Sequence, residues 1–264
     1  MKLKIGIFDS GIGGFTILGP LLKKRKDLEV FYLADTKRVP YGNKDIEQIR
    51  SIAKEICNWF EDKNLDALLV ACNTTNACAL DILENFLGIP VFDLINSVSE
   101  IVTKKNIGVL ATSATIKTAY YKKILESKIE NVKVFQQACP EFVSEIEKIK
   151  LNSNKLNCLS DLYLNPLIKN DIKEIILGCS HYPLIYNVLR NKTPSNIRII
   201  DPSIALVNKF NNSFLIPRND CCKSISYENV KFFVTSKSEE FSKKVKIWLE
   251  INKEIRLVNL RSNA

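Results

Sequence analysis

The stretch Leu68-Leu69-Val70-Ala71-Cys72-Asn73-Thr74-Thr75 decides the fold, because it has a counterpart in Ile175-Ile176-Leu177-Gly178-Cys179-Ser180-His181. Each is a short apolar run that stops at a cysteine followed by small polar residues. Such a run predicts a buried strand, and the polar residues predict the loop at its carboxyl end. In open α/β sheets that loop is where ligands bind. We therefore expect a site with one thiol on each of two walls.

Around the first cysteine, strand patterns alternate with helix patterns. Residues 4–8 and 29–33 are apolar runs that predict strands, and the apolar residues of 46–60 recur at helical spacing. Asn43 is the expected N-cap of that helix. Strands and helices alternating at these lengths predict a parallel sheet covered by helices.

The pattern then restarts. Asn106-Ile107-Gly108-Val109-Leu110-Ala111-Thr112-Ser113 aligns with Lys4-Ile5-Gly6-Ile7-Phe8-Asp9-Ser10-Gly11 at an offset of about 102 positions. The two cysteine strands are offset by about 107 positions. Two separate matches at nearly the same offset predict a duplicated unit.

The last segment is too short for a third domain. Residues 230–234 predict a strand, and Ser236-x-x-Glu239 predicts a capping box for a final helix. We expect this tail to return to the first unit. The predicted fold class is α/β, with two pseudo-symmetric domains, each a mainly parallel sheet flanked by helices, and an active site in the cleft between them. The expected domains are residues 1–97 plus 208–264 and residues 98–207.

Composition excludes several classes of protein. The 264 residues are 46% hydrophobic, enough for one or two cores. The amino terminus lacks the pattern of a signal peptide, and no apolar run approaches the roughly 18 residues that span a bilayer. We expect a soluble, cytoplasmic protein with no membrane partner. The net charge of +9 comes from scattered lysines without a basic stripe, which favours a solvated Lys-rich surface over a nucleic-acid groove. Its positive potential would still draw in an anionic substrate.

The eight cysteines include no Cys-x-x-Cys pair, so free thiols are expected, without a disulfide framework or a metal site. Cys57, Cys78, Cys139 and Cys158 are predicted to be packing or surface residues. The adjacent Cys221 and Cys222 lie in a polar stretch without metal-ligand spacing.

Cys72 and Cys179 are the leading candidates for chemistry. A cysteine can act as nucleophile or as general base once its thiolate is favoured. A lone cysteine at a strand end is usually structural, but two at matching positions of a duplication favour a function. Two equivalent thiols facing each other fit a reaction that removes a proton from one face of a carbon and returns one to the other face.

Two ionisable residues lie close to the cysteines in the expected fold. His181, the only histidine, follows Cys179 by two residues and can raise its thiolate fraction or hold its proton. A cysteine hydrolase using this pair stays open, although it leaves Cys72 unexplained. Asp9 ends the first strand and can accept a thiol proton or hold a substrate ammonium, whereas it would repel a phosphate.

The glycines that follow Asp9 do not indicate a dinucleotide. Gly11-x-Gly13-Gly14 lacks the third glycine of that fingerprint, since Thr16 stands there. We interpret the glycines as a tight turn that allows close backbone approach. Uncharged polar residues nearby suit the binding of a carboxylate, although one or two of them can instead be ordinary helix caps: Ser10, Asn73, Thr74, Thr75 and Ser180.

Read together, these residues resemble the glutamate racemase family of the aspartate/glutamate racemase superfamily, cofactor-independent enzymes that supply D-glutamate for peptidoglycan. The matching segments are Ile7-Phe8-Asp9-Ser10-Gly11-Ile12-Gly13-Gly14, Tyr32-Leu33-Ala34-Asp35, Pro40-Tyr41-Gly42, Ala71-Cys72-Asn73-Thr74, residues 112–121 and Leu177-Gly178-Cys179-Ser180-His181-Tyr182-Pro183. Ser180 stands where the family usually has threonine, and Glu141 and Ser144 replace its usual leucine and proline.

The resemblance implies roles for particular residues. Cys72 and Cys179 would be the two acid–base residues, one for each enantiomer, assisted by Asp9, His181 and Glu147. The residues implied to line the substrate are Ser10, Tyr41, Gly42, Asn73, Thr74, Thr118 and Ser180. The implied protein needs no cofactor or metal, binds glutamate and forms a homodimer. The alternatives are a racemase of the same architecture for aspartate or a hydantoin, and a two-lobed amino-acid-binding protein without catalysis.

Overall fold

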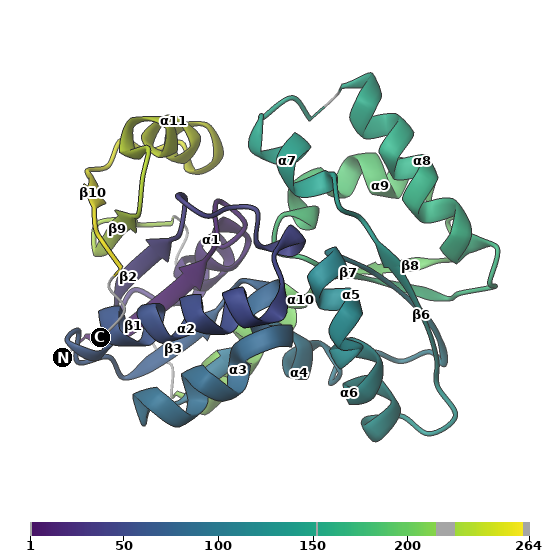
Figure 1. Ribbon diagram of the computed structural model, residues 1–264, viewed down its shortest axis with the longest axis horizontal. Coiled ribbons are helices and arrows are strands. Elements are labelled where there is room, and N and C mark those ends of the chain that lie inside the picture. Colours follow the sequence, from purple (N-terminus) through teal and green to yellow (C-terminus); the bar gives the residue numbers. More distant parts are fainter. Residues whose placement is uncertain (1, 152, 215–224, 261–264) are drawn as a thin grey trace.

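The computed structural model describes residues 2–151, 153–214 and 225–260, which form two lobes, each built on its own sheet (Figure 1). Every strand pair is parallel, and helices cover the sheets. The predicted fold class, two pseudo-symmetric α/β halves with mainly parallel sheets, is confirmed.

The first sheet has the strand order β10-β9-β2-β1-β3-β4. Its strands are β1 (Leu3–Asp9), β2 (Leu28–Ala34), β3 (Ala67–Val70), β4 (Val91–Asp93), β9 (Val230–Val234) and β10 (Ile255–Leu257). The helices of this half are α1 (Phe15–Lys24), α2 (Ile46–Glu61), α3 (Asn73–Leu87) and α11 (Ser238–Leu249), with a short 3₁₀ helix at Tyr41–Asn43. The apolar face of α2 is buried because Ile49, Ile52, Ile56 and Phe60 share one side of the helix.

The second sheet has the strand order β6-β5-β7-β8. Its strands are β5 (Asn106–Ala111), β6 (Lys133–Ala138), β7 (Glu174–Gly178) and β8 (Arg198–Ile200). Its helices are α5 (Ser113–Thr118), α6 (Tyr120–Lys128), α7 (Phe142–Glu147), α8 (Asn154–Ile168) and α9 (Tyr186–Lys192), with a 3₁₀ helix at Tyr182–Ile185.

The duplication predicted from the sequence is visible in the order of the strands and in their packing. The order β2-β1-β3-β4 in one half matches β6-β5-β7-β8 in the other. Gly6 in β1 lies so close to its neighbours that an added Cβ would meet Leu65, Leu68 and Phe60 at 2.8 Å. At Gly108 in β5 the corresponding neighbours are Ile172 at 2.9 Å, Leu167 at 3.0 Å and Ile175 at 3.6 Å. Ile172, Leu167 and Ile175 are separated from Leu65, Phe60 and Leu68, respectively, by the same number of positions that separates Cys179 from Cys72.

The chain passes between the halves at α4 (Leu94–Val98) and returns through α10 (Pro202–Ser213). These two helices pack together, and Lys209 of α10 forms an ion pair with Glu100 at 2.9 Å.

The tail then joins the first sheet as expected, since β9 pairs with β2 and β10 with β9. The expected domain boundary between residues 207 and 208 falls inside α10, and the domain limits stay a prediction.

Two predicted helix caps are wrong. Asp45, and not Asn43, caps α2, because the Asp45 carboxylate accepts the N–H of Gln48 at 2.8 Å. The capping box at Ser236 does not form. Ser236 instead exchanges hydrogen bonds with Thr36 at the end of β2, at 2.6 and 3.0 Å, so α11 begins later, at Ser238.

Among the described residues, each helix is too short or too polar to cross a bilayer. The described cysteines are free thiols, of which Cys57, Cys78 and Cys139 are buried and Cys158 is exposed. Cys221 and Cys222 lie outside the described residues.

Candidate active site

Both candidate thiols lie at the carboxyl ends of strands in the middle of their sheets. Cys72 occupies the N-cap position of α3, two residues after β3, and its exposed fraction is 3%. Cys179 directly follows β7, and its exposed fraction is 5%. Because β3 and β7 occupy equivalent positions in the two sheets, each half delivers its cysteine to the same end of its fold.

The surroundings of Cys72 are mostly uncharged. Its thiol donates to Ser10 Oγ at 3.9 Å. Burial, the charge of Asp9 and the smaller influence of Cys179 raise the pKa of Cys72 to about 12, against opposing hydrogen bonds from Thr75. Cys72 is therefore a protonated thiol at neutral pH.

Cys179 belongs to a chain of charged side chains. His181 forms a hydrogen bond with Cys179, and Nε2 of His181 donates to Oε1 of Glu147 at 2.7 Å. Burial acts to lower the pKa of His181, but the hydrogen bonds and charges of Cys179 and Glu147 outweigh it and raise that pKa well above its usual value. The contacts of His181 with Cys179 and Glu147 therefore favour its protonated form, the imidazolium.

Glu147 is the carboxylate that stabilises this imidazolium. Burial opposes its ionisation, but the hydrogen bond and charge of His181, together with the charge of Lys244, lower the pKa of Glu147 to about 2. Oε2 of Glu147 accepts from Lys244 Nζ at 2.6 Å, and Oε1 also accepts the N–H of Ile12 at 3.3 Å. Sequence reasoning reached Glu147 only through the family resemblance, and it missed Lys244.

Asp9 links the two halves. It lies at the end of β1, fully buried, and accepts the N–H of Gly11 at 2.8 Å through Oδ1. Its Oδ2 accepts the hydroxyl of Ser180, from the second half, at 2.7 Å. Burial raises the pKa of Asp9, and the charge of His181 opposes that rise. Asp9 is thus shared between the thiol-bearing ends of both sheets.

The glycine loop after Asp9 lies directly against the second half. An added Cβ at Gly11 would overlap Glu147 Oε1, and one at Gly13 would overlap Ser180 Oγ and come within 2.8 Å of His181 Nδ1. Neither glycine has a positive φ. Their role is therefore the close backbone approach predicted from the sequence, since only glycine leaves room for these side chains.

One buried polar atom next to Cys72 has no partner. Asn73 Nδ2 makes no hydrogen bond within the described part of the protein. Asn73, Cys179 and Ser203 also line a narrow crevice that is too tight to hold a water molecule. The other residues lining it are Thr16, Leu94, Leu177, Ser180, Pro183, Asp201 and Pro202. Ser203 was not predicted as a site residue, although its place just after a strand was a signal for it.

Other predicted substrate-lining residues are already engaged within the protein. The Tyr41 hydroxyl donates to Asp35 Oδ2 at 2.5 Å, although its ring packs in the same apolar cluster as Cys72. Gly42 lies against Thr112, whose hydroxyl shares a hydrogen bond with that of Thr74 at 3.0 Å. The Thr118 hydroxyl donates to a carbonyl of its own helix at 2.8 Å. The structure brings Tyr41, Gly42 and Thr74 near the junction, while the Thr118 hydroxyl bonds within its own segment, to the carbonyl of Thr115 and the N–H of Tyr120.

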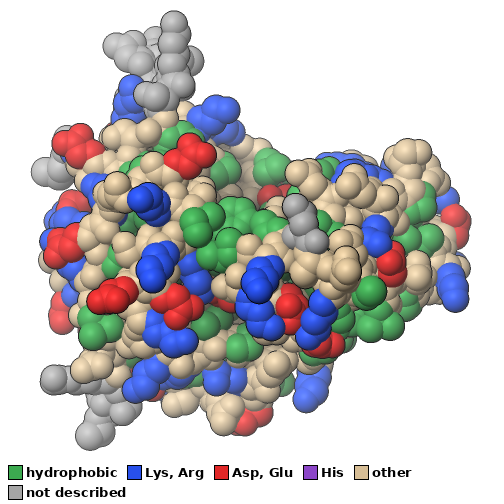
Figure 2. Space-filling view, turned by 90° about the horizontal axis from the view of Figure 1, so that it is seen from above, with side chains coloured by type: hydrophobic (Ala, Val, Ile, Leu, Met, Phe, Trp, Pro, Cys, Tyr) green, Lys and Arg blue, Asp and Glu red, His purple; other side chains and the backbone are tan. Residues whose placement is uncertain are grey.

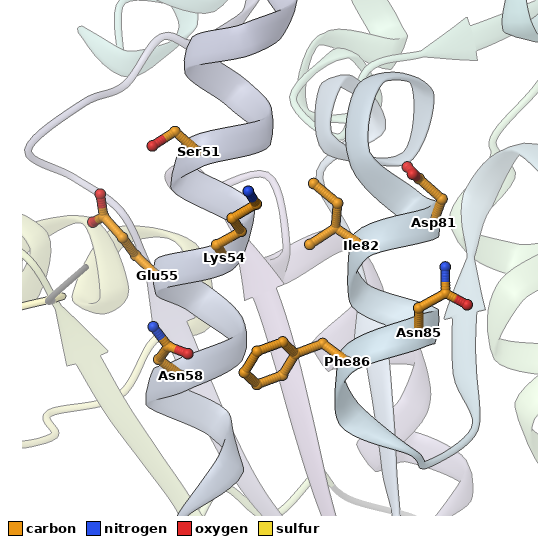
Figure 3. A pocket seen from close by; sticks show the side chains of 8 residues that line it. All are labelled: Ser51, Lys54, Glu55, Asn58, Asp81, Ile82, Asn85 and Phe86. Atoms are coloured by element: carbon orange, nitrogen blue, oxygen red, sulfur yellow. The ribbon is translucent and has the colours of Figure 1, made fainter. Parts of the chain in front are cut away.

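A larger pocket, of about 620 Å³, is lined by none of these residues. It lies between α2 and α3 on the first half, with side chains from both helices around it (Figure 3). Its lining residues are Ser51, Lys54, Glu55, Asn58, Asp81, Ile82, Asn85 and Phe86. Because neither cysteine and no predicted site residue lines this pocket, we place the candidate site at the junction.

Two features indicate the class of protein to which this chain belongs. The α/β fold is duplicated, and each half brings one buried thiol to a junction that also holds carboxylates and an imidazolium. A family model described as Asp/Glu/Hydantoin racemase matches residues 21–210. The chain therefore belongs to the Asp/Glu/hydantoin racemase family. It is an isomerase, and the resemblance found in the sequence is confirmed.

Individual relatives agree with this assignment. A glutamate racemase of Prochlorococcus marinus (strain NATL1A) is 46% identical over 263 residues, covering 99% of both chains. One of Synechococcus sp. (strain CC9605) is 36% identical over 255 residues, covering 96% of both. The crystal structure of glutamate racemase from Francisella tularensis subsp. tularensis SCHU S4 in complex with D-glutamate has a TM-score of 0.88 at 29% identity and covers 98% of each chain.

Proposed function

We propose that this enzyme interconverts L- and D-glutamate without a cofactor, by moving the α-proton between Cys72 and Cys179, and that its product supplies peptidoglycan synthesis. The observation that carries the proposal is the pair of buried thiols at equivalent strand ends of two matched halves. The names of the relatives at 46% and 36% identity support glutamate as the substrate.

The first step transfers the α-proton of glutamate to one sulfur. In this step Cys179 starts as thiolate: the Cα–H bond breaks, an S–H bond forms on the Cys179 sulfur, and the electron pair of the broken bond stays on the α-carbon. Cys72 is the proton donor in this direction, because its raised pKa keeps it protonated. It returns a proton to the opposite face of the carbon, and its S–H bond breaks. The two cysteines exchange roles for the other enantiomer.

Proton transfer alone does not supply the rate. An α-proton is far less acidic than a thiol, and general acid–base catalysis contributes about 10²- to 10⁴-fold. The rest must come from placing the carbon between the two sulfurs and from stabilising the carbanion electrostatically. In this proposal Asp9 holds the substrate ammonium, and the unpartnered Asn73 Nδ2 donates to a carboxylate of the substrate.

The direct test is incubation of the purified enzyme with L-glutamate alone in deuterated water, followed by chiral analysis and mass spectrometry. We expect D-glutamate to form with one deuteron at the α-carbon. Binding of glutamate without racemisation or α-proton exchange would overturn the proposal in favour of a binding protein.

Aspartate and hydantoins are the second candidate substrates, because the matching family includes racemases for both. The same assay with L-aspartate and with a chiral hydantoin decides between them. We expect glutamate to give the largest kcat/KM. The homodimer and the cytoplasmic location stay predictions, and light scattering of the purified protein tests the homodimer.

A further inference from the structure

One lysine of the C-terminal tail reaches across the junction to the charged chain at Cys179. Helix α11, which follows β9, faces α7 of the second half across the space between the lobes (Figure 1). Lys244 of α11 places Nζ 2.6 Å from Oε2 of Glu147, the last residue of α7. The side chains of Lys244 and Glu147 are only 12% and 14% exposed. This ion pair is therefore largely removed from water.

The two oxygens of the Glu147 carboxylate have different partners. Oε1 faces His181 at 2.7 Å and Oε2 faces Lys244 at 2.6 Å. The neighbouring Lys148 pairs with Glu145 at 2.8 Å, and Lys244 also lies 3.4 Å from Glu240. Lys244 is thus the lysine that fixes the orientation of this carboxylate.

The ion pair borders open space. Glu147 and Lys244 line a cavity of about 290 Å³ between α7 and α11, together with apolar residues and with Lys148, Lys237 and Glu240. The surface seen from above the two lobes also combines apolar and charged side chains, with apolar side chains at its centre and charged ones around them (Figure 2). Without Lys244, the Glu147 carboxylate has room to turn away from His181, towards water or Lys148.

We propose that Lys244 is a positioning residue for proton transfer at Cys179: it holds Glu147 so that its other oxygen stays hydrogen-bonded to His181, which in turn contacts Cys179. This inference rests on the proposed racemisation. Among the described residues, the hydrogen-bond partners of Cys72 are instead the hydroxyl-bearing Ser10 and Thr75. Loss of Lys244 should therefore slow one of the two proton transfers and leave the other nearly unchanged.

The first measurement needs no substrate. His181 is the only histidine of the chain, so an imidazole N–H signal, identified by the ¹⁵N shift of its ring nitrogen, belongs to it alone. The signal should be present in the wild type, in Lys244→Arg and in Lys243→Met, an exposed neighbour on the same helix. It should be lost in Lys244→Met and Lys244→Gln, with Glu147→Gln as the reference for a broken contact. Retention in both charge-removing variants, or no signal in the wild type, overturns the inference.

The second measurement separates positioning from a general structural defect. Because L- and D-glutamate are equally stable, kcat/KM must fall by the same factor in both directions, and we expect about tenfold for Lys244→Met. The isotope effect on kcat/KM with α-deuterated glutamate should rise for the enantiomer that Cys179 deprotonates and fall towards 1 for the other. Glu147→Gln should change each isotope effect in the direction seen for Lys244→Met, up for one enantiomer and down for the other. Lys244→Arg should keep the wild-type values.

The outcomes distinguish the two proposals. Isotope effects that stay unchanged, or that move together, overturn the role of Lys244. A wild-type enzyme that fails to racemise glutamate overturns the proposed function, and the NMR measurement still decides whether Lys244 positions His181. Circular dichroism establishes whether each variant is folded. Because Lys244→Met and Lys244→Gln both remove the charge, the test can be made with either one if the other does not fold.

Discussion

The two halves of the molecule have the same strand order and place a cysteine at the same point, but they surround it differently. Cys72 lies among hydroxyl groups, with Asp9 as the nearest charge that affects it. Cys179 contacts an imidazolium that is itself paired with Glu147. The duplicated backbone thus determines where each sulfur lies, while side chains that are not duplicated determine the charge around it.

Each site also depends on the opposite half. Asp9 of the first half accepts a hydrogen bond from Ser180 of the second, and Glu147 of the second accepts one from Ile12 of the first. A separated half would therefore retain its thiol but lose part of its electrostatic environment.

The largest expected effect tests the symmetry of the two thiols. Cys72→Ser and Cys179→Ser should each lower the racemisation rate by at least about 10²-fold, because each removes one of two required acid–base groups. Chiral analysis of both directions measures this, and Cys158→Ser on the exposed face of α8 is the matched control. If only one replacement impaired the enzyme, the two sulfurs would not be equivalent.

The second prediction tests the asymmetry of charge. The pKa of Glu147 is lowered from 4.5 to about 2, so its ionisation stabilises the fold above pH 4.5, and this contribution is lost as the pH falls towards 2. The shift corresponds to about 3 kcal/mol of unfolding free energy. Glu147→Gln should be less stable by about this amount at pH 7 and should lose less stability in acid, as measured by urea unfolding at several pH values.

The control for that experiment is Glu126→Gln, which removes an exposed ion pair with Lys122 at 3.7 Å. Exposed pairs of this kind contribute about 0–1 kcal/mol, so this variant should keep the acid sensitivity of the wild type. Equal acid sensitivity in Glu147→Gln and the wild type would contradict the assigned charge network.

The third prediction tests the contact between the halves. Gly13→Ala places a Cβ onto Ser180 Oγ and 2.8 Å from His181 Nδ1, so both side chains must move. Misplacement of catalytic groups by about 1 Å can cost about 10²-fold, and we expect kcat/KM to fall by about that factor. Gly19→Ala, where the nearest atom is Tyr227 Oη at 4.0 Å, should retain activity. Steady-state kinetics compares the two, and a fully active Gly13→Ala would refute the close approach.

The smallest effect tests the duplicated packing. Gly6→Ala and Gly108→Ala should each destabilise the fold by about 1–3 kcal/mol, because the added methyl group crowds equivalent apolar side chains in the two halves. Denaturant unfolding measures both, and Gly19→Ala in helix α1 should instead be neutral or slightly stabilising. A large loss in one half alone would show that the cores have diverged.

The sequence predicted those parts of the fold that depend on local pattern. The strand over 230–234 was predicted to the residue, and the cysteine-bearing strands were located because their apolar runs end at small polar residues. The caps were less predictable. Ser236 has the right spacing for a capping box, but Thr36, about 200 positions earlier, takes its hydrogen bonds.

The site shows the same division. Cys72, Cys179 and Asp9 could be inferred because they directly follow or end predicted strands, and parallel strands bring such ends together. Lys244 could not be inferred, because it is one of many lysines on an amphipathic helix. Only the position of α11 opposite α7 of the second half decides which lysine meets Glu147. For the same reason, the sequence could not reveal that the Tyr41 hydroxyl is bound to Asp35.

The packing of α4 against α10 has a consequence for how glutamate enters under the proposed function. The described crevice beside Cys179 is narrow, so the halves must separate for a substrate to reach it. They are joined at two adjacent crossings, held together by the contacts of these helices and the Lys209–Glu100 ion pair. Two neighbouring links permit rotation about the line through them and resist sliding or twisting. On reclosing, the two sulfurs would therefore come back to the same alignment in every turnover.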